Sequence, residues 1–167
     1  MRTERFFVMS KLKRSEKLAF LAVSNGGEVT YHRLKNFTEF SVSKNPVNYS
    51  RQYIDEDFER NDVVSYAPSV SYSFDYDNEN LAHGVIVGIT DNELVGDDAL
   101  IKMVFVDIAD TDGECQASLR EWSVIPDKEG SDANAYDYSG TFRANGKRTA
   151  GTATSDDNWE TCSFTAL

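Results

Sequence analysis

The sequence predicts a mainly β protein, built as two packed antiparallel sheets (a β-sandwich or partly open barrel) with one short flanking helix. Three observations predict this class. Eight Tyr and ten Phe occur among 167 residues, and aromatic side chains favour strands. Apolar and polar residues alternate over several short segments, which are separated by clusters of turn-forming residues. The apolar fraction of 40% is sufficient for one domain with its own core.

The first third of the chain is expected to hold three strands. Residues 17–23 are an apolar run that ends at the turn-forming residues 24–27. Two alternating segments then flank Asn45-Pro46, which predicts an extended hairpin over residues 37–54. Because this hairpin is polar on both faces, it buries little alone, and we expect either a floppy arm or a segment covered by another subunit. The charged residues 55–62 are expected to form a linker.

The clearest alternation runs from Ser69 to Tyr76, with apolar side chains at the even positions and mostly serine at the odd positions. This pattern predicts a strand with one packed face and one wet face. The wet face can contact bulk solvent or a water-filled channel, and the sequence leaves both open. Residues 78–90 then place apolar side chains at helical spacing, with Asn78 or Asn80 as a candidate N-cap, which predicts a short helix.

The second half of the chain is expected to complete a set of about eight strands. An acidic turn at residues 110–114 joins two of them, and a polar, acidic loop spans residues 127–137. Asn145-Gly146 predicts a type I′ hairpin, because both residue types tolerate positive φ. These strands are expected at residues 101–108, 116–125, 139–144, 147–154 and 159–165.

Charge divides the chain into two parts. The first 20 residues contain six basic and two acidic residues, whereas the whole chain carries a net charge of −11. We therefore expect a basic N-terminal arm over residues 1–16 and a single domain over residues 17–167. A domain this acidic is not expected to bind a nucleic-acid backbone, because that binding depends on cations that replace phosphate counterions. The acidity is explained either by solubility or by repulsion of a phosphate chain.

No catalytic, cofactor-binding or metal site is expected. The acidic turn at residues 110–114 is too short for a calcium-binding EF-hand loop and is flanked by strands. Gly140 and Gly146 are separated by five residues, and Arg148 stands where a phosphate-binding loop needs Ser or Thr.

The remaining chemically active residues also form no motif. His32 and His83 are far apart in sequence, and each is expected to be a surface or packed histidine. Cys115 and Cys162 have no metal-binding spacing and are expected to remain thiols. No apolar run reaches the roughly 18–20 residues that a membrane-spanning helix requires.

Several segments, in this order and spacing, resemble the major tail tube proteins of phages and prophages of Gram-positive bacteria. The resemblance extends over roughly residues 15–165. The segments are Lys44–Glu56, Pro68–Tyr76, Ile89–Leu94, Trp122–Asp127 and Tyr138–Gly140, followed by Gly146 and Gly151-Thr152.

The resemblance implies a non-enzymatic structural protein with the tail tube fold. Six copies are expected to form a ring whose strands join a continuous inner β-barrel, and stacked rings are expected to form the channel for DNA ejection. The implied partners are other copies of the chain, a tape measure protein, tail terminator and baseplate or distal tail proteins, and in some tails a sheath. DNA passes through the lumen without specific binding, and no membrane is involved. The implied location is the virion tail, with assembly in the host cytoplasm.

Two alternatives remain open. Contractile tails and phage-derived bacteriocins use tube subunits of the same fold. A small β-sandwich binding module, such as a carbohydrate-binding domain, is the alternative from a different functional class. That alternative requires exposed aromatic platforms, for which Trp122 and Trp159 are the candidates, although the apolar neighbours of Trp122 indicate a core position.

Four hypotheses about assembly follow. Residues 37–54 contribute to the ring interface or to the lumen, residues 1–16 contact a neighbouring subunit, and the lumen is net negative. The Asn145-Gly146 turn places Arg143 opposite Arg148, and this pair of cations is expected to need an acidic partner from the same or a neighbouring subunit.

Overall fold

The computed structural model describes residues 11–108 and 113–167. Strands hold 56% of the described residues, and one α-helix is present among them, so the predicted mainly β class is confirmed. The elements are η1 (Arg14–Glu16), β1 (Lys17–Asn25), β2 (Glu28–Arg33), β3 (Phe37–Ser43), β4 (Pro46–Arg51), β5 (Arg60–Tyr66), β6 (Ser69–Asp75), α1 (Leu81–Asp91), η2 (Gly96–Ala99), β7 (Leu100–Asp107), β8 (Cys115–Glu129), β9 (Asp137–Ala144), β10 (Thr149–Thr154) and β11 (Thr161–Ala166).

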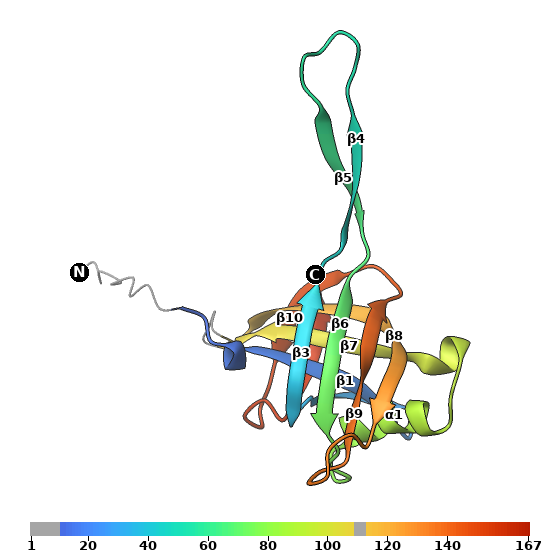
Figure 1. Ribbon diagram of the computed structural model, residues 1–167. Helices are drawn as coiled ribbons and strands as arrows, with labels where there is room; N and C mark the ends of the chain where they lie inside the picture. Colours follow the sequence, from blue (N-terminus) through green and yellow to red (C-terminus); the bar gives the residue numbers. More distant parts are fainter. Residues whose placement is uncertain (1–10, 109–112) are drawn as a thin grey trace, which may run out of the picture.

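Six antiparallel strands close into a barrel in the order β10-β11-β2-β1-β7-β8, and the predicted barrel is therefore closed rather than partly open. The closing contact is between β8 and β10, where Cys115 lies opposite Ala153 and Leu119 opposite Thr149. The long β8 then continues out of the barrel and pairs with β9. Strands β8, β9, β6 and β3 form a second layer, called here the front sheet, which crosses the barrel strands β1, β7 and β10 behind it (Figure 1).

The core has two parts because β1 and β7 present opposite faces to two compartments. Phe20 and Val104 are buried inside the barrel, in a cluster that also contains both cysteines. Leu21 and Met103 point the other way, into the space between the barrel, the front sheet and α1, where Trp122 is also buried. This alternation is what a strand buried on both faces requires.

The helix α1 begins close to the expected position. The side chain of Asn80 accepts hydrogen bonds from the backbone N–H groups of Ala82 and His83, as an N-cap residue does. Ile86 and Ile89 are buried on the face toward the core. A methyl group added at Gly84 or Gly88 would meet no atom from outside the helix within 4 Å, so the core does not require glycine at either position.

The predicted hairpin over residues 37–54 is wrong in its pairing. β3 pairs with β6, and β4 pairs with β5, so the chain passes through Asn45-Pro46 without reversing. Asn45 has a positive φ of 47°, and its side-chain amide donates to the carbonyl of Ala67 across the hairpin. The reversal occurs at residues 52–59, inside the segment that was expected to be a linker. Pro46 is tolerated because it is the first residue of its strand.

The predicted type I′ hairpin at Asn145-Gly146 is also wrong. β9 pairs with β8 and β6, whereas β10 pairs with β8 and β11. Neither residue of the turn has positive φ, and the N–H of Asn145 bonds to the carbonyl of Glu121. The turn is a corner at which the chain leaves the front sheet and enters the barrel. Arg143 consequently lies opposite Ser69 and Ser123, and the expected pairing with Arg148 does not form.

Smaller differences concern the loops and the N-terminus. β8 extends to Glu129, so the loop expected over residues 127–137 is shortened by the strand. Most of the acidic turn at residues 110–114 and most of the N-terminal arm at residues 1–16 lie outside the described residues. Within the described part of residues 1–16, Arg14 contacts its own chain, because its guanidinium donates hydrogen bonds to the carbonyls of Lys17 and Phe40.

Candidate assembly surfaces

The residues with catalytic or metal-binding chemistry do not converge. Among residues 11–108 and 113–167, no group of three His, Cys, Asp or Glu side chains could hold a metal ion. His32 lies in β2 and His83 in α1. Gly140 lies within β9 and Gly146 at the corner that follows it, so neither belongs to a loop at the N-terminus of a helix, where phosphate groups bind.

His83 has a structural role. Its Nδ1 accepts a hydrogen bond from the N–H of Asp77 at 3.1 Å, and its Nε2 lies 2.5 Å from the carbonyl oxygen of Lys35. These partners require the neutral tautomer with the proton on Nε2. Burial of the ring lowers its pKa, which also favours the neutral form. The side chain thus ties α1 to the segment between β2 and β3.

Both cysteines are buried thiols in the barrel interior. Burial raises the pKa of Cys162 to about 12, with a further contribution from the carboxylate of Asp157. A thiol with this pKa stays protonated at neutral pH and is a poor nucleophile. The prediction that both cysteines remain thiols agrees with this arrangement.

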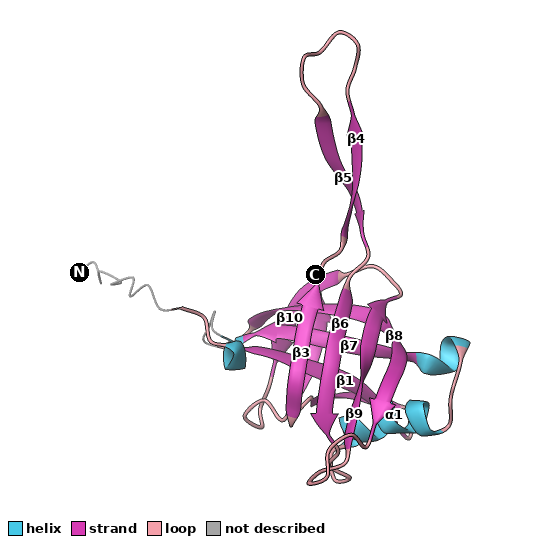
Figure 2. Cartoon of the chain, viewed as in Figure 1, coloured by secondary structure: helices cyan, strands magenta, loops and turns pink. Residues whose placement is uncertain are grey.

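The most exposed part of the molecule is the projecting hairpin formed by β4, β5 and their connection, residues 46–66, called here the arm. It extends away from the two-layered body (Figure 2). Every residue of β4 and β5 is exposed. The exposed set nevertheless includes eight large apolar or aromatic side chains, which are Val47, Tyr49, Tyr53, Ile54, Phe58, Val63, Val64 and Tyr66.

Contacts within the arm are local. Arg60 pairs with Glu56, and the hydroxyl of Ser50 donates to the side-chain carbonyl of Asn61. The guanidinium groups of Arg51 and Arg60 both lie over the ring of Tyr53. A two-stranded hairpin with no third strand and no packed face is marginally stable in water. The apolar side chains of the arm are therefore the strongest indication of an interaction surface.

The front sheet has two open edges among the described residues. β3 pairs with a strand on one side only, and no strand pairs with β8 beyond Ser123 on the side where β7 ends. An open edge presents unpaired N–H and C=O groups, which can bind a strand from another chain. The guanidinium of Arg14 donates a hydrogen bond to the carbonyl of Phe40 on β3. Residues 41–43 therefore remain as the part of that edge available for pairing.

The outer face of the front sheet is rich in small hydroxyl side chains. Register assigns to this face Glu39, Ser41 and Ser43 of β3, Ser69, Ser71, Ser73 and Asp75 of β6, Asp137, Ser139, Thr141 and Arg143 of β9, and Ser123, Ile125 and Lys128 of β8. We call it the serine-rich face. It carries three carboxylates (Glu39, Asp75 and Asp137) and two cations (Arg143 and Lys128). A hydrogen bond from the Ser131 hydroxyl, assisted by backbone N–H groups, lowers the pKa of Asp137 and keeps it ionised.

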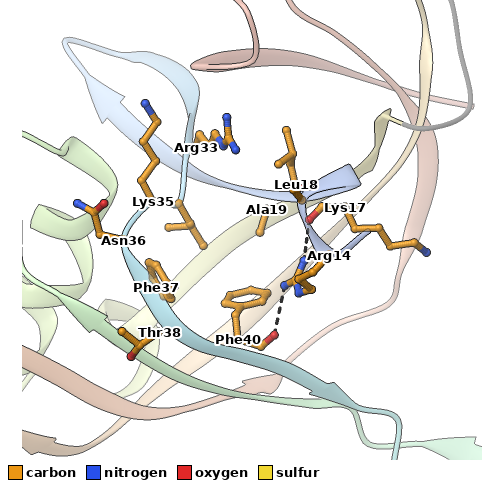
Figure 3. A pocket seen from close by; sticks show the side chains of 12 residues that line it. Arg14, Lys17, Leu18, Ala19, Arg33, Lys35, Asn36, Phe37, Thr38 and Phe40 are labelled. Atoms are coloured by element: carbon orange, nitrogen blue, oxygen red, sulfur yellow. Dashed lines mark hydrogen bonds between the residues drawn. The ribbon is translucent and has the colours of Figure 1, made fainter. Parts of the chain in front are cut away.

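A cleft of about 640 Å³ lies between the start of β1, the start of β3 and the segment that joins β2 to β3. Its rim carries the basic side chains of Arg14, Lys17, Arg33 and Lys35, and none of its twelve lining residues is acidic. Apolar side chains, including Phe37 and Phe40, line its interior (Figure 3). We call it the basic cleft. A concentration of positive charge is unusual on a chain with a net charge of −11.

The tryptophans do not form an exposed platform. Trp122 is 2% exposed and belongs to the core beside the front sheet, as expected. Trp159 is half-buried and its ring lies 6.1 Å from that of Phe20. Sugar-binding platforms need a ring face open to solvent, so neither residue favours the carbohydrate-binding alternative.

No known protein family matches the sequence, and no curated protein is significantly similar to it. None of the described helices is long and apolar enough to cross a lipid bilayer.

Proposed function

We propose that this protein is the structural subunit of a phage tail tube, with no enzymatic activity of its own. Six copies form a ring, and stacked rings form the channel through which DNA leaves the particle. The observation that carries the proposal is the arm, whose exposed apolar side chains have no partner surface within the described residues of the chain. The order of sequence segments that resembles tail tube proteins supports the same function.

The front sheet supplies the ring contact in this proposal. Residues 41–43 at the edge of β3 pair with the free part of β8 in the next copy, at residues 124–129. Each copy has one edge of each kind, so the contact repeats from copy to copy and closes into a ring when the rotation allows it. Closure removes the open edges, which are otherwise sites of aggregation.

The serine-rich face then lines the channel. Most side chains of this face are short hydroxyls, and its three carboxylates, which outnumber the cations Arg143 and Lys128, repel phosphate groups. DNA consequently slides past without the counterion release that drives binding. This role explains why a strand with the regular alternation of β6 keeps polar residues on one complete face.

The same geometry serves tubes of contractile tails, of non-contractile tails and of phage-derived bacteriocins. A tape measure protein fills the lumen during assembly, tail terminator and baseplate or distal tail proteins bind the two ends, and a sheath surrounds the contractile forms. Assembly takes place in the host cytoplasm, and the mature subunit resides in the virion tail.

Electron microscopy of the purified protein over a range of concentrations tests the proposal. Rings or tubes with an open lumen are expected. Hydrogen exchange on the same samples should show residues 46–66 gaining protection upon assembly, while β1 in the barrel serves as an internal control with unchanged protection. A protein that stays monomeric at every concentration contradicts the proposal, and retention of that monomer on a glycan column supports the carbohydrate-binding alternative.

A further inference from the structure

The reversal of the arm at residues 52–59, called here the tip, has a composition opposite to that of the basic cleft. Asp55, Glu56, Asp57 and Glu59 give it four carboxylates within five residues. Ile54 and Phe58 are exposed beside them. The tip thus presents apolar side chains surrounded by negative charge, whereas the basic cleft presents an apolar interior with a positive rim.

Three of the tip carboxylates are available to a partner. Arg60 already binds Glu56 within the arm, which leaves Asp55, Asp57 and Glu59, all exposed. In the basic cleft, Lys35 pairs with Glu160, and Arg14 is held by backbone carbonyls. Arg33 and the exposed Lys17 are therefore the cations best placed to bind an incoming carboxylate, although Lys17 also lies 3.9 Å from Asp107.

The tip cannot reach the basic cleft of its own chain. The basic cleft lies at the start of β3, around Phe37 and Phe40, whereas the arm continues from the end of that strand. An extended chain rises about 3.3 Å per residue, so the segment from Phe40 in the basic cleft to residue 52 at the start of the tip spans roughly 40 Å. Figure 1 shows the arm pointing away from the body. The tip of one copy can therefore reach only the basic cleft of another copy.

We propose that the tip of one copy docks into the basic cleft of the next copy. Ile54 and Phe58 enter the apolar interior, and the exposed carboxylates of the tip bind Arg33 and Lys17 at the rim. The contact joins two different surfaces of the same chain, and contacts of this kind propagate from copy to copy. This docking rests on the proposed function, which requires the copies to close into rings. It deepens that function by assigning the surface that receives the arm.

This docking is compatible with the edge contact of the front sheet. The basic cleft uses residues at the start of β3, at 37, 38 and 40, whereas the edge contact uses residues 41–43. Charge complementarity also supplies directionality, because two tips repel each other and two basic clefts repel each other. Copies therefore associate head to tail.

The test exchanges the charges of the two surfaces in the full-length protein. The tip variant carries Asp57→Lys with Glu59→Lys, and the cleft variant carries Arg33→Glu with Lys17→Glu. Each variant alone is expected to need at least about tenfold more protein to associate, because close charge pairs across an interface couple strongly. An equimolar mixture is expected to regain association close to that of the original chain. In a ring where the two variants alternate, the basic tip of the tip variant meets the acidic cleft of the cleft variant, and the unchanged tip of the cleft variant meets the unchanged cleft of the tip variant. Sedimentation velocity against concentration measures both effects.

A second mixture separates docking from general charge attraction. The matched control carries Lys102→Glu with Lys147→Glu, which gives the same net charge as the cleft variant at exposed positions outside the basic cleft. It should associate normally alone and should fail to rescue the tip variant. Circular dichroism and thermal unfolding check that every variant folds.

The outcomes distinguish docking from the proposed function. If the original chain forms rings and either charge-reversed variant does so equally well, or if the control rescues the tip variant as well as the cleft variant does, docking is refuted and the ring proposal stands. If the mixture regains association but only open oligomers form, docking is supported and the tail tube function is refuted. A chain that remains monomeric at all concentrations overturns both.

Discussion

The body and the arm use the same secondary structure with opposite results. Along β6 in the body, alternate residues are buried, whereas no residue of β4 or β5 in the arm is buried. Val104 in the barrel is 0% exposed, and Val64 in the arm is 61% exposed. Burial of a valine side chain contributes about 1.5–3 kcal/mol, so the same residue type stabilises the body and contributes little to the arm.

This difference shows that the two regions depend on different partners. Each inner strand of the body has neighbours on both sides and a packed face, so its stability is provided by one chain. In the arm, each strand has one neighbour and no packed face. We infer that the arm reaches full stability only when a second copy covers it, whereas the body folds independently.

Excision of the arm is the strongest test of this difference. Replacement of residues 46–66 by Asn-Gly closes the chain between Asn45 and Ala67, which are already joined by two hydrogen bonds. The body should keep its melting temperature to within a few degrees, and ring or tube formation should be lost. Electron microscopy and thermal unfolding measure the two effects. Loss of folding would show that the body depends on the arm, contrary to our inference.

A glycine inside the front sheet provides the next largest effect. A methyl group at Gly140 would lie 2.5 Å from the carbonyl oxygen of Ile125 and 2.8 Å from the hydroxyl of Tyr72. The Gly140→Ala variant should therefore lose about 3 kcal/mol of unfolding free energy, at the upper end of overpacking effects. Gly146→Ala is the matched control, because its nearest neighbour is 3.8 Å away. Equal losses in urea unfolding would contradict the packing of β9 against β8.

A pair of valine truncations compares the two regions directly. Val104→Ala should lower the free energy of unfolding by about 2 kcal/mol, because it removes two buried methyl groups. Val64→Ala should change it by less than about 0.5 kcal/mol, as exposed substitutions do, yet weaken association. Urea unfolding of the dissociated protein measures the effect on stability, and sedimentation of the assembled protein measures the effect on association. A large loss from Val64→Ala in the monomer would show that the arm is covered by its own chain.

The smallest effect concerns a turn of the body, where Asp157 accepts hydrogen bonds from the hydroxyl and N–H of Thr161 and from Ser155. These bonds lower the pKa of Asp157 from 3.8 to about 2. The depressed pKa means that the carboxylate contributes stability above about pH 4, and that this contribution is lost as the pH falls through 2. Asp157→Asn should lower the melting temperature slightly at pH 7, and the difference should shrink between pH 4 and pH 2. A difference independent of pH would contradict the prediction.

Two local sequence signals, side-chain alternation and helix capping, each predicted an element correctly. The alternation over residues 69–76 yielded a strand with the expected buried face, and Asn80 caps the helix that begins one residue later. The candidate assembly surfaces were predicted less well. The polarity of residues 37–54 was recognised, but β5 was missed as the partner strand of β4, because residues 55–62 were interpreted as a linker. The basic cleft was also missed, since Arg14, Arg33 and Lys35 come from separate segments.

The sequence by itself did not predict β2 and β5, but it determined most of the other strands, the buried face of β6 and the residue at which the helix begins. These properties depend on neighbours within a few residues, through side-chain alternation and capping. The tertiary structure alone decided which strands are neighbours. Asn45-Pro46 and Asn145-Gly146 both appeared to be hairpin turns, and both lie where the chain goes on to a different partner. Backbone hydrogen bonds are the same for any pair of strands, so the choice of partner follows from burial of both core compartments together, which no local turn signal specifies.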